Sequence, residues 1–264
     1  MSTRTVSINT DIGEGFGVWG VSDEAPLMDQ VTAANIACGF HAGDPDILRR
    51  TCEMAAAREV SVGAQVSYRD LAGFGRRFID VPTPTLVNDI VYQIGALQAF
   101  ARIAGTVVSY VKAHGALYNT AARHPGQAHA IVDAIGLVDP DLPVLCQYDT
   151  VLWHAALDAG LTPRAEVFID RAYTDEGLLV PRSHPDALVV DPSTAAKRAV
   201  HMVMTGAVDT VDGGTATVLP DGAATIAMCV HSDTPGAVDI ARQTRELFGR
   251  NDVALVGIGG GRDD

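Results

Sequence analysis

Residues 33–66 read AANIACGFHAGDPDILRRTCEMAAAREVSVGAQV, and this stretch decides the fold. The apolar run Ala33 to Cys38 has the length of a buried strand, and a polar loop follows it. Asp44 and Pro45 then form a helix start, because aspartate accepts hydrogen bonds at the N-cap and proline suits the first helical position. A stretch of helical period runs on to Arg58, and a second strand-like run follows it. Two strands joined by a crossover helix predict a parallel β-α-β unit.

The same alternation of strand-like and helical segments continues along the chain. The predicted strands are Val6 to Asp11, Ala33 to Cys38, Ser61 to Val66, Val107 to Ala113, Pro143 to Tyr148, Ala165 to Asp170 and Thr225 to His231. The predicted helices are Pro45 to Arg58, Thr85 to Ala104, Ala128 to Ile135, Thr150 to Ala159, Thr194 to Thr205 and Pro235 to Phe248. At 264 residues the chain is close to the typical barrel length of about 250 residues. We therefore predict one α/β domain over residues 1–264, a seven-stranded (β/α) barrel, with 258–264 as a flexible tail.

Breaks in the alternation indicate where loops lie. Two irregular regions, Tyr68 to Pro84 and Ala172 to Asp191, each follow a strand, where the active-site loops of barrels grow. The segment Val208 to Gly222 is predicted to form a small hairpin, because it holds two turn sequences. Thr234 and Pro235 are predicted to cap the last helix as Asp44 and Pro45 cap an earlier one.

Composition excludes several classes of protein. The net charge of −13 disfavours nucleic acid and anionic membranes as partners, since no basic cluster offsets it. No signal-peptide core or apolar run of membrane-spanning length is present, which predicts a cytoplasmic protein. The four cysteines are far apart and without a C-x-x-C pair, so we expect reduced thiols and neither a zinc knuckle nor a redox pair.

Polar side chains gather at the ends of the predicted strands. In a parallel barrel all carboxyl ends of the strands open on one face, so these residues are expected to converge there. Burying so many unpaired charges would cost several kcal/mol each, and a purely structural rim has no reason to collect them. The cluster therefore indicates a binding and catalytic site.

Two glycine-rich segments, 13–17 and 73–77, would let the backbone approach a ligand closely. Neither has the lysine and spacing of a P-loop, so this chain is not expected to bind ATP by itself. Arg76, Arg77 and Lys112 are the candidates to meet a carboxylate or phosphate, because guanidinium groups bind planar anions bidentately and an ammonium acts as a point charge.

These segments also resemble a known family. The chain is similar to the LamB/YcsF family over nearly its whole length, from Ile8 to about Leu247. The resemblance rests on the blocks NTDIGE (9–14), ANIACGFHAGD (34–44), GFGRR (73–77), VKAHGALYN (111–119), EVFIDR (166–171) and CVHSD (229–233).

The resemblance implies a seven-stranded variant of the (β/α) barrel of glycoside hydrolases and polysaccharide deacetylases. It also implies that the chain serves as the A subunit of a bacterial 5-oxoprolinase, which uses ATP to hydrolyse 5-oxo-L-proline to L-glutamate together with subunits B and C. ATP is then expected to bind on the partner subunits. Whether the chain also forms a homo-oligomer stays open.

The candidate site combines the strand ends with the family blocks. Candidate catalytic residues are Asp11, His41, Lys112, His114 and His231. Candidate substrate-binding residues are Glu14, Asn35, Gln65, Tyr68, Arg76, Arg77, Tyr118, Glu166, Asp170, Arg171 and Asp233. In the hypothesis that follows, Asp11 or His41 is the general base, Lys112 and Arg76 stabilise the phosphate or the oxyanion, and His114 or His231 protonates the departing nitrogen.

Three positions depart from the family pattern. Gln65 stands where the family has histidine in Gly-Ala-His-Pro, Ala113 replaces the proline of Lys-Pro-His, and Ser232 replaces the glycine of His-Gly-Asp. Loss of the strand-three histidine, with no H-x-x-x-H pair in the chain, argues against a metal site, so no metal ligand is expected. Two rivals remain: an amidohydrolase or deacetylase that holds a divalent ion with Asp11, His41 and His114, and a non-catalytic subunit that binds a small ligand and regulates its partners.

Overall fold

A computed structural model describes residues 4–223 and 225–259. Its main sheet has the strand order β10-β1-β2-β3-β4-β5-β6-β9, and β1 also pairs with β9. All these pairings are parallel, so β1, β2, β3, β4, β5, β6 and β9 form a closed seven-stranded barrel. The strands are β1 (Thr5–Ile12), β2 (Ala33–Ala37), β3 (Ser61–Val66), β4 (Val108–Ala113), β5 (Val144–Cys146), β6 (Pro163–Phe168), β9 (Thr225–Cys229) and β10 (Ala254–Leu255). The predicted fold class is confirmed.

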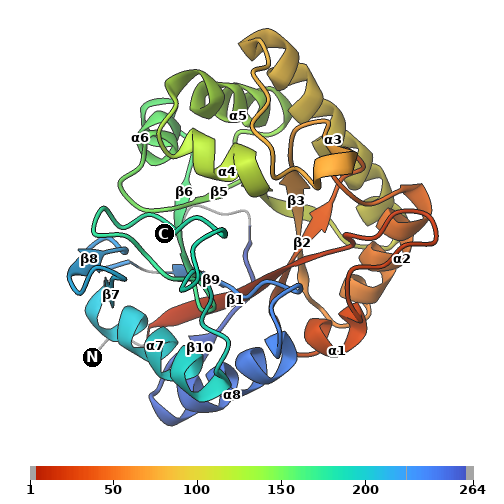
Figure 1. Cartoon of the computed structure of the whole chain (residues 1–264). Coiled ribbons are helices and arrows are strands. Elements are labelled where there is room, and N and C mark those ends of the chain that lie inside the picture. Colours follow the sequence, from red (N-terminus) through yellow and green to blue (C-terminus); the bar gives the residue numbers. More distant parts are fainter. Residues whose placement is uncertain (1–3, 224, 260–264) are drawn as a thin grey trace.

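Helices surround the strands, as Figure 1 shows. They are α1 (Glu24–Met28), α2 (Pro45–Ala56), α3 (Thr83–Ile103), α4 (Gly115–Ala121), α5 (Pro125–Val138), α6 (Val151–Asp158), α7 (Pro192–Thr205) and α8 (Ala237–Arg250), with a 3-10 turn over Leu71–Gly73. One large apolar cluster joins the outward faces of the strands to the buried faces of the helices. None of the helices within the described ranges is long and apolar enough to cross a membrane.

Capping explains where helix α2 begins. Asp44 accepts hydrogen bonds from the backbone N–H groups of Asp46 and Ile47, at 2.9 and 3.0 Å, and Pro45 takes the first helical position as predicted. The prediction for Thr234 and Pro235 is wrong. Helix α8 begins at Ala237 after Gly236, and the Thr234 hydroxyl donates to the Asp170 carboxylate instead.

Several elements differ from the predicted boundaries. Strand β5 ends at Cys146, because Asp149 adopts a left-handed conformation with φ 59° and the Thr150 hydroxyl donates to the carbonyl of Gln147, which closes a turn. Strand β6 ends at Phe168, two residues before the predicted end. Helices α1 and α4 were not predicted, and α4 begins directly after the carboxyl end of β4.

Strand β10, which was not predicted, fills a gap in the barrel. It pairs with Thr5 and Val6 of β1, whose other edge is occupied by β9. Strand β2 pairs with β1 only from Asn9 onward, so β10 lies where β1 and β2 diverge. Ile258 continues this segment: it is buried and its N–H donates to Ser61 Oγ. Ile258 is therefore anchored, and residues 260–264 of the predicted tail lie outside the described residues.

Smaller features agree with the sequence. Strands β7 (Ala207–Asp209) and β8 (Thr215–Thr217) form the predicted antiparallel hairpin. Both long irregular regions lie after strands, at the carboxyl ends of β3 and β6. All four cysteines are free and buried.

Candidate active site at the carboxyl ends of the strands

Side chains that face into the barrel change from apolar to polar along the strands. The amino-terminal end is filled by Ala33, Tyr110, Leu145, Ala227 and Ile258. Because side chains on a strand alternate between its two faces, residues two positions further on face inward again. Those residues are Asn35, Lys112, Gln147 and Cys229. Two residues further along the chain from Lys112 and Cys229 stand His114 and His231. The barrel register therefore brings the polar side chains to one mouth.

Lys112 lies at the centre of the buried polar layer. Its ammonium is 3.2 Å from Asp11 Oδ1 and 2.9 Å from Glu166 Oε1, and the side chain is only 3% exposed. Burial alone would lower the pKa of Lys112, but Asp11, together with Cys229 and Glu166, raises it well above its usual value. The ammonium is therefore charged at neutral pH and holds carboxylates from β1 and β6 together.

A second set of hydrogen bonds fixes Asp11 from the side of the amino-terminal ends of the strands. Asn35 Nδ2 donates to Asp11 Oδ1 at 2.9 Å and to Asn9 Oδ1 at 2.7 Å. The Tyr110 hydroxyl in turn donates to Asn35 Oδ1 at 2.7 Å. Gly63 makes room for this tyrosine, because a Cβ atom at that position would lie 2.1 Å from the aromatic ring. Tyr110 and Asn35 therefore position Asp11 without reaching the mouth.

Four buried residues form a second cluster beside Asp11. Gln65 Nε2 lies 3.0 Å from Glu14 Oε1 and 2.9 Å from His114 Nδ1, and Gln65 Oε1 lies 3.2 Å from His41 Nε2. The rings of His41 and His114 stack with their centroids 4.1 Å apart. Gln65 thus joins one carboxylate to two imidazoles.

The tautomer of His114 follows from its partners. His114 Nε2 lies 3.0 Å from the backbone carbonyl of Phe74, which can only accept a hydrogen bond. A neutral ring protonated at Nε2 has its lone pair on Nδ1, which lies 3.4 Å from Glu14 Oε1 and 3.5 Å from Asp11 Oδ2. The reactive nitrogen of His114 is therefore directed at the two carboxylates.

The two carboxylates have opposite pKa shifts. Burial would raise the pKa of Asp11, but the charge of Lys112 holds it well below the usual value. Burial, followed by the charge of Asp11, raises the pKa of Glu14 well above its usual value. Burial and the neighbouring His114 lower the pKa of His41. Asp11 is thus ionised at neutral pH and His41 is uncharged.

Asp170 orients His231. Its carboxylate accepts hydrogen bonds from the backbone N–H of His231 and from His231 Nδ1, each at 3.1 Å, and from the Thr234 hydroxyl. Burial would raise the pKa of Asp170, but His231 and these hydrogen bonds lower it to about 2. The His231 ring stacks on Phe168. With Nδ1 held by Asp170, Nε2 is the ring nitrogen left to act on a ligand.

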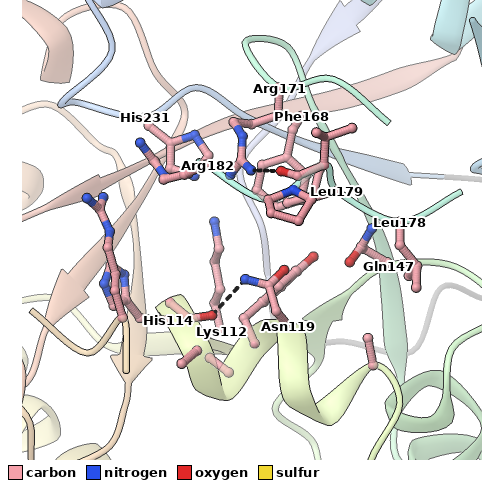
Figure 2. A pocket seen from close by; sticks show the side chains of 18 of the residues that line it. Lys112, His114, Asn119, Gln147, Phe168, Arg171, Leu178, Leu179, Arg182 and His231 are labelled. Atoms are coloured by element: carbon pink, nitrogen blue, oxygen red, sulfur yellow. Dashed lines mark hydrogen bonds between the residues drawn. The ribbon is translucent and has the colours of Figure 1, made fainter. Parts of the chain in front are cut away.

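A cavity of about 560 Å³ opens over these groups. Figure 2 shows Lys112 and His114 on one side of it and Arg182 and His231 on the other. Its wall includes Asp11 and five cationic side chains: Arg76, Lys112, Arg123, Arg171 and Arg182. In a chain of net charge −13, a cavity with this lining is suited to an anionic ligand.

Two loops meet over the cavity through a shared carboxylate. Asp233, which follows β9, accepts a hydrogen bond from Arg76 Nη2 at 2.6 Å and from Arg182 at 3.3 Å. Arg76 follows β3 and Arg182 follows β6. The side chain of Arg76 is 36% exposed, so a ligand carboxylate or phosphate can reach it.

Most of the predicted site residues meet at the mouth, and some lie elsewhere. Arg77 pairs with Asp70, and its side chain is 65% exposed. The Tyr68 hydroxyl donates to Gln127 in the apolar core. Arg171 lines the cavity, but its guanidinium donates to the backbone carbonyls of Val180 and Ala187 and so holds a loop. The remaining predicted residue, Tyr118, lines the cavity and lies beside Lys112.

Several residues at the site were not predicted. Asn9 and Tyr110 could have been found from alternation, because they precede Asp11 and Lys112 by two positions on the same strands. Arg182 lies in the irregular region after β6, and no local pattern distinguishes it from other surface arginines. Phe168 belongs to the EVFIDR block and stacks on His231.

A smaller cavity of about 320 Å³ lies on the other side of the histidine pair. Glu14 and His41 line it together with apolar side chains that include Phe16, Trp19 and Phe74. Among the described residues, Glu14, His41 and His114 bring three possible metal-ligand atoms within 4.8 Å of one another.

Comparison with known proteins gives consistent matches. The sequence profile of the LamB/YcsF family matches residues 6–261. A curated protein from Mycobacterium avium strain 104, named as the A subunit of 5-oxoprolinase, is 54% identical over 241 residues, which cover 91% of this chain and 94% of that protein.

Two solved structures share the fold. The crystal structure of the lactam utilization protein from Thermus thermophilus has a TM-score of 0.89 at 38% identity and covers 96% of this chain and 100% of its own. The catalytic domain of peptidoglycan N-acetylglucosamine deacetylase from Eubacterium rectale ATCC 33656 has a TM-score of 0.50 at 10% identity, with coverage of 99% and 94%. The second likeness concerns the fold alone.

Proposed function

Because this chain belongs to the LamB/YcsF family, we propose that it is the A subunit of a 5-oxoprolinase, a hydrolase that opens the lactam of 5-oxo-L-proline to give L-glutamate. The observation that carries the proposal is the 54% identity to a protein of that name, with each chain covered almost completely. The buried charges at the barrel mouth supply the chemistry that such a reaction needs.

The lining of the large cavity suits the substrate. 5-Oxoproline carries a carboxylate next to its lactam ring, and guanidinium groups bind carboxylates through two parallel hydrogen bonds. Arg76 and Arg182 share Asp233, so an incoming carboxylate can replace Asp233 as their partner. We assign these two arginines to substrate binding, and Lys112 to the polar end of the lactam.

The reaction is expected to need ATP. An unactivated amide resists attack by water, and phosphorylation of its oxygen makes the ring carbon electrophilic. Water adds to that carbon, the ring C–N bond breaks to leave an acyl phosphate of glutamate, and a second water releases glutamate and phosphate. This chain has no nucleotide-phosphate loop, so we assign phosphorylation to partner subunits B and C. The name of the relative, which specifies an A subunit, denotes one part of a multisubunit complex.

Within the barrel, each group has a distinct task. Asp11 is ionised and lines the cavity, so it can accept a proton from the attacking water. Lys112 and Arg76 offset negative charge that develops on the oxygen or the phosphate. His231, oriented by Asp170, is placed to protonate the departing nitrogen. His41 does not line the large cavity and is buried behind His114, so Asp11 is the better of the two predicted bases.

The test is ATP-dependent release of glutamate from 5-oxo-L-proline by the chain reconstituted with subunits B and C. We expect release to require all three subunits, and Asp11→Asn to abolish it. Asp186→Asn, which changes an aspartate with an 80% exposed side chain, is the matched control and should leave turnover unchanged. Useful turnover by the isolated chain, or full turnover with Asp11→Asn, would contradict the proposal. The second result would favour a non-catalytic binding subunit.

A further inference from the structure

Glu14, His41 and His114 have the arrangement of an incomplete metal coordination sphere. Glu14 Oε1 lies 3.9 Å from His41 Nε2 and 3.4 Å from His114 Nδ1. A tetrahedral zinc ion with ligands at about 2.1 Å separates neighbouring ligand atoms by about 3.4 Å. The three residues follow three different strands, β1, β2 and β4, so no H-x-x-x-H spacing is needed to bring them together.

The backbone around His114 holds the ring as metal-bound histidines are held. Such histidines usually donate their other ring N–H to a carboxylate or a backbone carbonyl. His114 Nε2 donates to the carbonyl of Phe74, a residue in the left-handed conformation with φ 55°. The next residue is Gly75, where a Cβ atom would lie 2.9 Å from His41 and 3.0 Å from His114. This loop is therefore shaped to cover both rings.

Charge at the cluster favours a cation. Lys112 pairs with Asp11 and Glu166, whereas no lysine or arginine in the described ranges forms an ion pair with Glu14. Asp11 Oδ2 lies 3.5 Å from His114 Nδ1, which places a second carboxylate beside the three atoms. The Gln65 amide directs its NH₂ group at Glu14 and His114, where it meets the same lone pairs that a cation would take.

The cluster can be reached from two sides. Glu14 and His41 line the smaller cavity, and His114 lines the larger one next to Asp11. Catalytic metal sites have three protein ligands and an open position, whereas structural zinc sites are closed by four. Three ligands between two cavities match the first kind.

We propose that this chain binds one divalent transition-metal ion, zinc or manganese, through Glu14, His41 and His114. The Gln65 amide is then displaced from all three side chains, and the His41 proton moves from Nε2, which now donates to Gln65 Oε1, to the unpartnered Nδ1. Imidazole and carboxylate are the ligand types that both ions accept. The proposal does not depend on 5-oxoproline as substrate, and it concerns residues at which the sequence argued against a metal.

The test measures binding directly. Protein stripped with a chelator is titrated with Co²⁺, and visible absorption reports coordination by the histidines; Zn²⁺ is then measured by competition. We expect one equivalent of metal to bind. Loss of a residue that only hydrogen-bonds a metal ligand weakens metal binding about 10- to 100-fold, and Glu14→Gln and His114→Gln should each weaken it by more than that. His201→Ala, at an exposed histidine on α7, is the control and should bind as the wild type does.

Folding is checked separately, because His114 is buried. Metal-free melting temperatures and circular dichroism of both variants should match the metal-free wild type, and Glu14→Gln keeps the shape of the side chain. The proposal is overturned if no stoichiometric Co²⁺ or Zn²⁺ binding occurs, or if folded Glu14→Gln binds as tightly as the wild type. These readouts involve no turnover, so they are separate from the test of the lactam-hydrolase proposal.

Discussion

Replacing Lys112 by methionine should destabilise the folded chain strongly. Methionine has nearly the same length but no charge, so the change leaves Asp11 and Glu166 buried without their cation. Removing one partner of a buried ion pair costs about 3–5 kcal/mol. For a chain of this size each kcal/mol lowers the melting temperature by about 2–4 °C, so a fall of about 6–20 °C is expected.

The loss should depend on pH in a defined direction. In the wild type the pKa of Asp11 is held well below its usual value, so Asp11 contributes stability above the unfolded pKa of about 3.9 and loses it as pH falls through the lower folded value. Without Lys112, burial raises that folded pKa. Protonation of Asp11 then removes its unpaired buried charge and stabilises the variant. The difference in melting temperature between the variant and the wild type should therefore shrink as pH is lowered from 8 toward 5.

The assay is thermal unfolding of both proteins across that pH range. Lys197 is the only other lysine in the chain and is exposed on α7, so Lys197→Met is the matched control and should change the melting temperature by about 1–2 °C at most. The role of Lys112 as the central cation is refuted if Lys112→Met lowers the melting temperature no more than the control does. It is also refuted if the fall in melting temperature stays constant from pH 5 to 8.

Three other substitutions test separate parts of the site. Asp170→Asn should cost about 2–3 kcal/mol at pH 7, since its pKa of about 2 gives stability above about pH 4 that is lost as pH falls to 2; equal losses at pH 7 and pH 2 in denaturant titrations would contradict this. Gly63→Ala should lower the free energy of unfolding by about 1–3 kcal/mol, because the new Cβ pushes the Tyr110 ring aside. Gly95→Ala, in open space on α3, should be neutral or stabilising, and equal melting temperatures of the two variants would contradict the packing argument. Gln65→His should change glutamate release by the reconstituted complex by less than about tenfold, and a gain above about a hundredfold with a new ionisation between pH 6 and 9 would show that a proton carrier or a metal ligand is missing at this position.

The fold could be predicted because its signals are local. Strand-like runs, helical period and the cap at Asp44 each act within a few residues, and the barrel follows from their regular order. Elements that depend on contacts with residues far away in the sequence, or that are very short, were not predicted. Strand β10 has only the two residues Ala254 and Leu255, and it exists because β1 and β2 diverge there. Helix α4 has seven residues and directly continues a strand, so its helical period is too short to detect.

The site could be predicted as a group but not in its internal roles. Convergence of strand ends placed Asp11, Lys112 and Glu166 together, and these residues are in contact. Sequence could not show that Asp170 holds His231 and does not face the cavity, because that depends on how the segment after β6 turns. Arg182 was missed for the same reason, since a loop brings it across the mouth to Asp233.

Closure of the barrel between β1 and β9 also determines when the site can form. Thr10 of β1 donates to the carbonyl of Val230, 220 positions away, and His231, the next residue, acts on the charge of Asp11 in the same closed arrangement. Contacts of such long range are slow to form, because the entropy of closing a large loop must be overcome before they stabilise anything. During synthesis, most of the chain therefore leaves the ribosome with β1 lacking one neighbour and with its strand edge open to wrong partners. Activity should appear only with the last, cooperative step of folding, and chains that end before Thr225 should aggregate without forming a working mouth.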